Sequence, residues 1–68
     1  MELVDERDGR IVLALTSEEF WLLAGCVNEA IEAVEDWEFS TRLGAEKDEA
    51  RRLRVELSEL GSRLRPAE

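Results

Sequence analysis

Residues 17–36 carry the clearest helical pattern in the chain, and the first two turns of this segment are apolar on nearly every side. One helix face is marked by apolar residues at i, i+3 and i+4 spacing, namely Phe20, Leu23, Ala24, Val27, Ala30, Ile31 and Val34. Trp21, Leu22 and Cys26 lie off this face, so we expect the helix to be buried on more than one side. Cover for two faces must come from the other elements of the chain or from a second chain.

The chain is short, so the core that it can build alone is limited. A protein of 68 residues buries only about 60% of the surface that its unfolded form exposes. A core of this size rarely supplies more than about 3–5 kcal/mol. Cys26 is the only cysteine and there is no histidine, which excludes an internal disulfide and a cysteine-based zinc site within one chain. Association is the remaining source of stability, and we therefore expect a homodimer.

A β-hairpin is predicted for residues 3–15. The Asp8-Gly9 pair supplies the positive φ angles that a type I′ turn requires. Ile11 and Val12 are β-branched, and both faces of the second strand are apolar. Two strands alone are only marginally stable in water. We therefore expect one face of the hairpin to pack on the helices.

Two helices are predicted after the hairpin. Thr16 and Glu19 have the spacing of a capping box at the start of the helix 17–36. Residues 37–45 are predicted to be a connector, irregular or with one short helical turn, in which Gly44 is left-handed. The last helix, 46–64, has a narrow apolar seam of Ala50, Leu53, Leu57, Leu60 and Leu64. The predicted fold is α+β: a single domain, residues 1–68, of ββαα order with two antiparallel helices.

Negative charge is concentrated in the first part of the chain. Residues 1–41 carry eleven acids against two arginines, residues 42–68 carry seven bases and six acids, and the net charge is −8. Nucleic acid is an unfavourable partner because its phosphates need lysine and arginine, and anionic membrane surfaces are unfavourable for the same reason. A basic protein is favoured, because complementary fields raise the rate of encounter. The alternative is that the acidity only keeps the protein soluble.

The chain shows no pattern of a leader or a membrane span. Its first residues lack a basic region and a long apolar run, so we expect no secretory signal. The longest apolar stretches, 11–15 and 20–26, are far shorter than the roughly 20 residues that span a bilayer. A single cysteine suits a reducing compartment, and we expect a cytoplasmic protein.

An acidic cluster surrounds the end of the first predicted helix. We call it the acidic end and take it as the candidate partner-binding site: Glu29, Glu32, Glu35, Asp36, Trp37 and Glu38. These carboxylates repel one another and face the negative end of the helix dipole, and each conflict costs roughly 0.2–1 kcal/mol. Three explanations remain open. The acids pair with bases of the last helix (Lys47, Arg51, Arg52 and Arg54), they form a docking face for a basic partner, or they bind a metal, for which one helix face is a poor cage.

Three other side chains have an expected structural role. The planar guanidinium of Arg42 is expected to hold the carboxylate of Glu38 or of Glu49. Trp21 is expected to be buried in the core. Trp37 fits the core and an interface equally well, because tryptophan is enriched at binding hot spots.

The sequence does not predict an enzyme. Its serines have no histidine to activate them, and its glycines form no phosphate-binding motif. We expect no catalytic residue, no cofactor and no metal. One alternative function is a small DNA-binding regulator, because Leu43-Gly44 followed by a helix with Arg51, Arg52 and Arg54 is similar to the second half of a helix-turn-helix. The acids that begin this helix have the wrong charge for DNA.

Residues 13–60 also resemble a group of small, mostly uncharacterised bacterial proteins. These have an N-E-A/V segment on one helix, then E-F-x-T-R-x-G, then a helix that opens with acids and leucines. The matching residues here are Asn28, Glu29, Glu38, Phe39, Thr41, Arg42, Gly44, Glu49 and Leu53. In small size and acidity, such proteins are similar to immunity proteins and antitoxins, which is an analogy and implies no motif.

Together these features predict a small acidic protein-binding module. It would cover a basic protein in the manner of an immunity protein or antitoxin-like inhibitor, with the acidic end as the contact surface. A purely structural or accessory subunit is the other alternative, in which the apolar first helix is an assembly seam.

Overall fold

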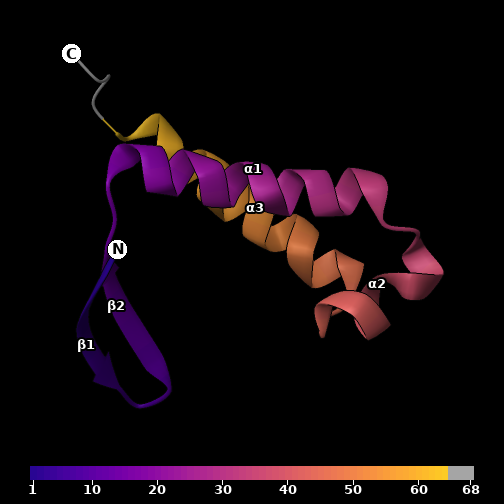
Figure 1. Ribbon diagram of the computed structural model, residues 1–68, viewed down its shortest axis with the longest axis horizontal. Coiled ribbons are helices and arrows are strands. Elements are labelled where there is room, and N and C mark those ends of the chain that lie inside the picture. The colour runs from indigo at the N-terminus through magenta and orange to yellow at the C-terminus, as the bar shows by residue number, and fades with distance from the viewer. Residues whose placement is uncertain (65–68) are drawn as a thin grey trace.

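The fold is a two-stranded hairpin followed by three helices (Figure 1). In this computed structural model, which describes residues 1–64, the elements are β1 (Glu2–Arg7), β2 (Arg10–Ala14), α1 (Ser17–Ala33), α2 (Asp36–Leu43) and α3 (Lys47–Ser62). The α+β class and the antiparallel hairpin are confirmed. The predicted ββαα order is wrong in one respect, because the segment predicted as a connector contains a third helix.

The hairpin has the predicted turn. Asp8 and Gly9 adopt φ angles of 53° and 77°, as a two-residue type I′ turn requires. The strands pair with Arg7 opposite Arg10 and Leu3 opposite Leu13, and a bulge interrupts the register between Leu3 and Asp5. The bulge lies on β1, so the backbone of β2 remains regular.

The capping box at the start of α1 is confirmed. The Thr16 hydroxyl accepts from the Glu19 backbone N–H, and the Glu19 carboxylate accepts from the Thr16 N–H. The amino group of Met1 also donates to Glu19 Oε2, at 2.8 Å. This amino group and the Thr16 N–H together lower the pKa of Glu19. The start of α1 is therefore fixed by the side chains that the sequence indicated.

The first helix ends earlier than predicted. α1 stops at Ala33, and Val34 is extended, whereas the sequence predicted a helix over 17–36. The acidic residues explain this end. Asp36 and Glu38 would face the negative end of a continuous helix, but they occupy the favourable first turn of α2 instead. The dipole conflict in the sequence was thus a signal for a helix break.

α2 replaces the predicted connector 37–45. It has eight residues and ends at Leu43, and the residue that caps it, Gly44, has a φ of 76°, which confirms the left-handed conformation. The predicted last helix, 46–64, is observed as Lys47–Ser62. Three helices joined by short turns therefore stand where two were expected.

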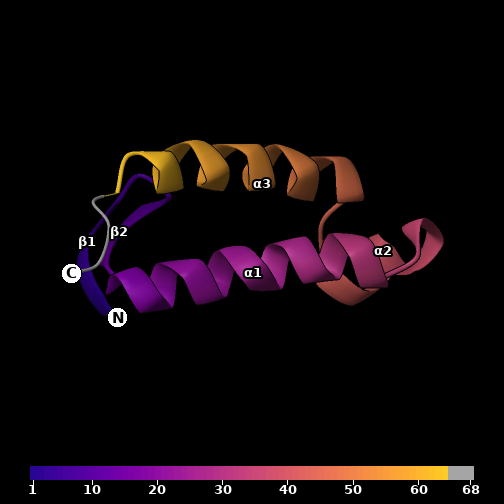
Figure 2. The same cartoon turned by 90° about the horizontal axis from the view of Figure 1, so that it is seen from above.

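The core is small and lies between the helices. α1 and α3 run antiparallel side by side, with α2 at one end of the pair (Figure 2). Ile31 is 7% exposed and Phe39 is 2% exposed, and they are the only large apolar side chains of residues 1–64 that are buried. The prediction that Trp21 is buried is wrong, because the side chain is 53% exposed.

Trp21 still has a packing role at the other end of the helix pair. Its ring lies so close to Gly61 that a Cβ there would be 2.5 Å from the ring edge. Gly61, which lowers the helix propensity of α3, is buried by this contact. A side chain at position 61 would move the ring away from α3.

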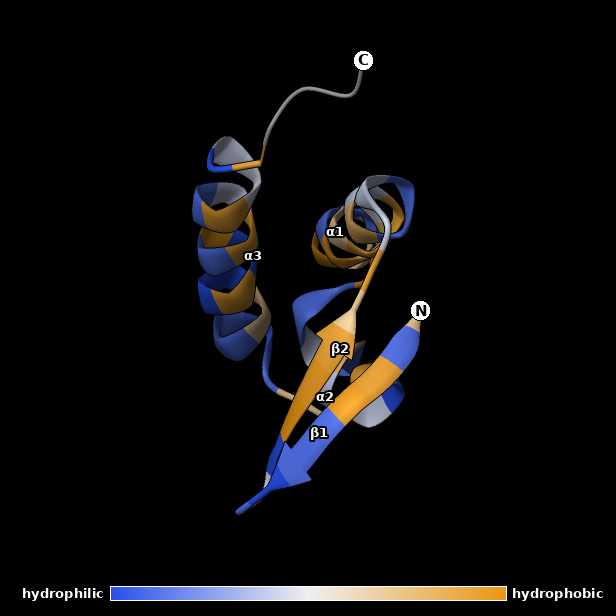
Figure 3. Ribbon diagram, turned by 90° about the vertical axis from the view of Figure 1, so that its left-hand side faces the viewer, coloured by the Kyte–Doolittle hydropathy of each residue, from blue (hydrophilic) through white to orange (hydrophobic). Residues whose placement is uncertain are grey.

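The hairpin extends away from the helices instead of covering them. Figures 1 and 3 show it projecting from the start of α1, with β2 apolar over most of its length. Within residues 1–64, the packing contacts between elements are β1 with β2, α1 with α3, and α2 with α3. The expectation that the hairpin packs on the helices is therefore wrong for the single chain.

Replacing Phe39 tests how far the stability of the small core depends on α2. We expect Phe39→Ala to destabilise the protein by about 3–5 kcal/mol, because it removes a fully buried aromatic ring. That loss is comparable to the whole stability of a core of this size, so the midpoint of urea unfolding should fall sharply.

Trp37→Ala is the matched control on the same helix. Its side chain is 78% exposed, and exposed substitutions usually change stability by about 0.5 kcal/mol or less. Equal losses of stability in the two variants would contradict the packing described here.

Candidate functional site

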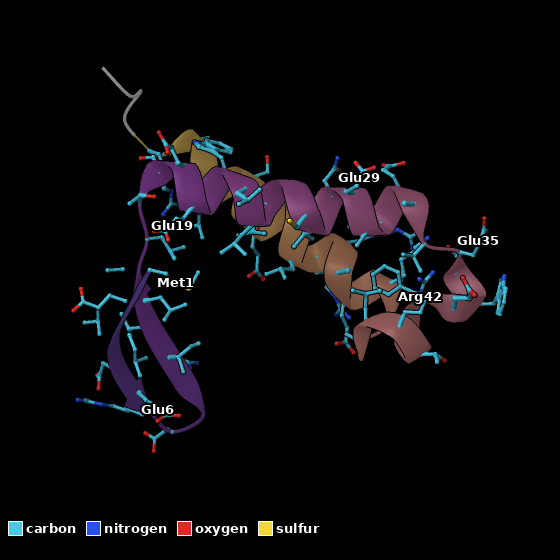
Figure 4. The ribbon with its side chains drawn as sticks, in the orientation of Figure 1. Met1, Glu6, Glu19, Glu29, Glu35 and Arg42 are labelled. Carbon is cyan, nitrogen blue, oxygen red and sulfur yellow. The ribbon has the colours of Figure 1, made fainter. Side chains whose placement is uncertain are left out.

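The acidic end is split over two helices and the turn between them. Glu29 and Glu32 lie on α1, Glu35 is the residue before α2, and Asp36, Trp37 and Glu38 form the first turn of α2. Figure 4 shows Glu29 and Glu35 pointing outward. The break after Val34 therefore replaces a single helix face with a bent, two-helix surface.

Lys47 connects the three helices at this end. It is the first residue of α3, and its ammonium group donates to the Val34 carbonyl at 2.7 Å and to Asp36 Oδ1 at 2.6 Å. The same nitrogen lies 5.6 Å from the centre of the Phe39 ring, within the range of a cation–π interaction. The Lys47 side chain is only 12% exposed. One cation thus binds the end of α1, the start of α2 and the main core ring.

This contact changes the titration of Asp36. The hydrogen bond from Lys47, followed by the charge of Lys47, lowers the pKa of Asp36 below its ordinary value of 3.8. The carboxylate is exposed, so water screens part of the interaction. Asp36 is therefore held ionised and is engaged within the chain.

Two further acids of the cluster have internal partners. Arg54 lies 3.5 Å from the Glu32 carboxylate and donates to the Asn28 side chain at 3.1 Å. Arg42 lies 3.6 Å from Glu38, one turn earlier on α2. These pairs are partly or largely exposed, and such pairs contribute about 0–1 kcal/mol.

Intramolecular pairing is therefore confirmed for part of the cluster. Lys47 and Arg54 serve as predicted, but Arg51 pairs with Asp48 of its own helix. Arg52 forms no ion pair with residues 1–64. Of the two partners expected for Arg42, Glu38 is observed and Glu49 is not.

Three members of the acidic end have no such partner. Within residues 1–64, no ion pair involves Glu29 or Glu35. Trp37, between Asp36 and Glu38, is the most exposed large apolar side chain among the described residues, at 78%. The surface that remains free is therefore an exposed indole flanked by carboxylates.

A shallow groove between the helices was missed by the sequence analysis. It has a volume of about 300 Å³ and is lined by Val27, Ala30, Phe39, Leu43, Ala45, Glu49, Ala50 and Leu53. Its walls come from three helices, so it could not be foreseen without the third helix. Its lining is almost wholly apolar, which suits an aliphatic side chain better than a polar cofactor.

Two kinds of feature are absent from residues 1–64. In residues 1–64, no three histidine, cysteine, aspartate or glutamate side chains are grouped so that they could hold a metal ion. Over the same residues, no helix is both long and apolar enough to cross a membrane.

No protein-family model, curated protein or solved structure matches the chain. The resemblance to small bacterial proteins in the segments 28–30 and 38–44 therefore stays a prediction. The features of the molecule that bear on its function are therefore the acidic end and the exposed apolar surface.

Because of the contact with Lys47, we expect a measurable decrease in the pKa of Asp36. Because its folded-state pKa is lowered, Asp36 stabilises the fold above about pH 3.8, and this stabilisation is lost as the pH falls through the lower value. In a carboxyl NMR titration, Asp36 should titrate below 3.8. In Lys47→Met it should return towards that value.

Arg51→Met is the control for this titration. Arg51 contributes the smallest of the effects that lower the pKa of Asp36, so its removal should leave the value nearly unchanged. An Asp36 that titrates at its ordinary value in the unmodified protein would contradict the contact.

Proposed function

We propose that the chain is a small protein-binding module that covers a basic protein partner with its acidic end. The observation that carries this proposal is the exposure of Trp37 between carboxylates. Tryptophan is enriched at the centres of protein interfaces, and the indole of Trp37 is 78% exposed. The flanking carboxylates would exclude acidic partners and attract basic ones.

The internal ion pairs favour a preformed docking surface. Lys47 fixes Asp36 and the start of α2, and Arg54 holds Glu32. Glu29 and Glu35 remain available on either side of the bend, so a partner does not need to break the internal pairs. A surface that is ordered before binding loses less conformational entropy on association.

In the proposed mechanism, the chain inhibits its partner by covering the partner's functional surface, in the manner of an immunity protein or antitoxin. Trp37 would enter an apolar depression of the partner, and Glu29 and Glu35 would pair with lysines or arginines around it. A cationic active site or substrate groove would then be blocked by steric exclusion and by charge neutralisation. This part of the proposal is supported by the size and acidity of the chain, with a net charge of −8.

The same proposal includes a homodimer in the cytoplasm. Most large apolar side chains of the hairpin and of the first turns of α1 are more than 40% exposed, among them Leu3, Ile11, Trp21 and Leu22. Self-association through the hairpin would cover part of this surface and leave the acidic end free for the partner. The single free cysteine, Cys26, is exposed and suits a reducing compartment.

Charge reversal tests the docking surface. We expect the protein, immobilised on beads, to retain basic proteins from a bacterial lysate at about 50 mM salt and to release them at high salt, as screened charges do. Glu29→Lys combined with Glu35→Lys should abolish retention, because it reverses the two acids of the acidic end that form no ion pair within residues 1–64, without disturbing the Lys47 contact.

The control for charge reversal makes an equal change of charge elsewhere. Glu56→Lys combined with Glu59→Lys lies on α3, outside the acidic end, and should leave retention intact. Equal loss of binding in both double variants would indicate a general charge effect. Equal retention in both would favour the structural or accessory subunit.

DNA binding is the second candidate, and one observation favours it. α2, the three residues 44–46 and α3 have the order of a helix-turn-helix, with a glycine in the turn. Against it, Asp48 and Glu32 engage Arg51 and Arg54. We expect no shift in the fluorescence polarisation of labelled duplex DNA at low salt. Binding with a steep salt dependence would replace the first proposal.

A further inference from the structure

The single chain exposes more surface than a compact protein of its mass. Its accessible surface is 5938 Å², whereas a compact monomer of this mass exposes about 4,400 Å². Subtracting about 650 Å² for residues 65–68, which lie outside the described part of the chain, leaves a surplus of about 900 Å². Stable complexes bury about 800 Å² per partner and obligate dimers more. The surplus therefore matches the area that a dimer needs.

Part of the exposed apolar surface lies on one face of the hairpin. Directly opposed residues of an antiparallel pair share a face, and residues two apart on one strand share it too. The register therefore places Leu3, Ile11 and Leu13 on the same face, where they are 59%, 60% and 39% exposed. No helix covers them within residues 1–64.

The free edge of β2 is suited to pairing with another strand. A two-residue turn makes Arg7 and Arg10 a hydrogen-bonded pair, and such pairs alternate along a hairpin. The peptide groups of Ile11 and Leu13 therefore point away from β1. β2 has no proline, no bulge and one charge, Arg10, so it carries none of the usual devices that prevent edge pairing except its short length.

The edge of β1 differs in each of these respects. It contains the bulge between Leu3 and Asp5, and bulges disrupt further pairing. It also carries three acids, Glu2, Asp5 and Glu6, which would meet acids of a second β1 strand. A strand of a second copy would therefore pair with the edge of β2 and not with the edge of β1.

We propose that β2 pairs antiparallel with β2 of a second copy, with Val12 opposite Val12 on the two-fold axis. The four-stranded sheet has the order β1-β2-β2-β1. In this register the outward peptide groups of Ile11 exchange hydrogen bonds with those of Leu13 in the other copy, and the reverse pair does the same. Every outward backbone group from Ile11 to Leu13 is then satisfied.

The register is self-complementary in side chains as well as in backbone. Leu3, Ile11 and Leu13 of both copies lie on one face and form a continuous apolar patch. Arg10 lies opposite Ala14, so the two arginines are about 13 Å apart along the strands, beyond the screening length of about 8–10 Å at physiological salt. The acids of β1 are kept at the outer edges. This arrangement specifies the homodimer proposed above and rests on it.

A pair of cysteine variants tests the strand pairing, both in a Cys26→Ser background. Val12→Cys places two thiols across the axis in a non-hydrogen-bonded pair, where Cα atoms are about 4.5 Å apart, within the disulfide range of about 4.4–6.8 Å. Asp5→Cys is the matched control, because Asp5 lies opposite Val12 on the outer strand. Under glutathione oxidation, we expect disulfide-linked dimers to form at least tenfold faster with the cysteine at position 12.

Leu13→Pro is a second, independent variant. It removes an N–H that points away from β1, so the hairpin can still form. We expect light scattering under reducing conditions to show a dimer for the unmodified protein. The dissociation constant should be at least tenfold higher for Leu13→Pro.

The outcomes of these experiments distinguish the β2 pairing from the homodimer on which it rests. A dimer that cross-links equally at positions 5 and 12, or at neither, overturns the β2 pairing and leaves the homodimer standing. A monomer at hundreds of micromolar overturns both. Neither result affects the docking of a basic protein by the acidic end, which the charge-reversal experiment measures separately.

Discussion

The Lys47 ammonium group makes the contact on which the arrangement of the helices depends. α1, α2 and α3 meet at one end of the molecule, and this nitrogen donates to the Val34 carbonyl and to Asp36 while it lies near the Phe39 ring. A helix C-terminus has carbonyl groups without partners, and a cation nearby satisfies both their hydrogen bonds and their dipole. The bend that divides the acidic end, and the orientation of Phe39 into the core, are thereby fixed together.

This arrangement gives the acidic residues two different tasks. Asp36, Glu32 and Glu38 have basic partners within the chain and stabilise the bend. Glu29 on α1 and Glu35 before α2 form no ion pair within residues 1–64, and the indole of Trp37 is 78% exposed. A cluster that looks uniform in sequence is thus separated into a structural set and a free set, and the proposed docking surface consists of the free set and the indole.

The hairpin, unlike the helices, is not packed against any other element of the described chain. β1 and β2 pair with each other, but their apolar face and the edge of β2 meet no other described part of the chain. A two-stranded sheet is marginal in water, and its register here is nevertheless well specified by the turn and by the pairing of Leu3 with Leu13. A hairpin that forms but is not covered by the rest of the chain is consistent with a homodimer. The surplus accessible surface of the chain is about as large as the area that a dimer buries.

Local signals in the sequence determined the parts of this fold that depend on neighbouring residues. Asp8-Gly9 specified the turn, Thr16 with Glu19 the start of α1, and Gly44 a left-handed turn, because each acts through hydrogen bonds or φ angles within a few residues. The acids near the end of α1 were a local signal for a helix break, but only the tertiary structure decided where α1 ends and which bases pair with the acids, since Lys47 reaches across eleven residues to Asp36 and Arg54 reaches across twenty-two to Glu32. Periodicity could not show whether the apolar faces of the hairpin and Trp21 are covered, because it reports which side chains favour burial and not which surface is near enough to bury them.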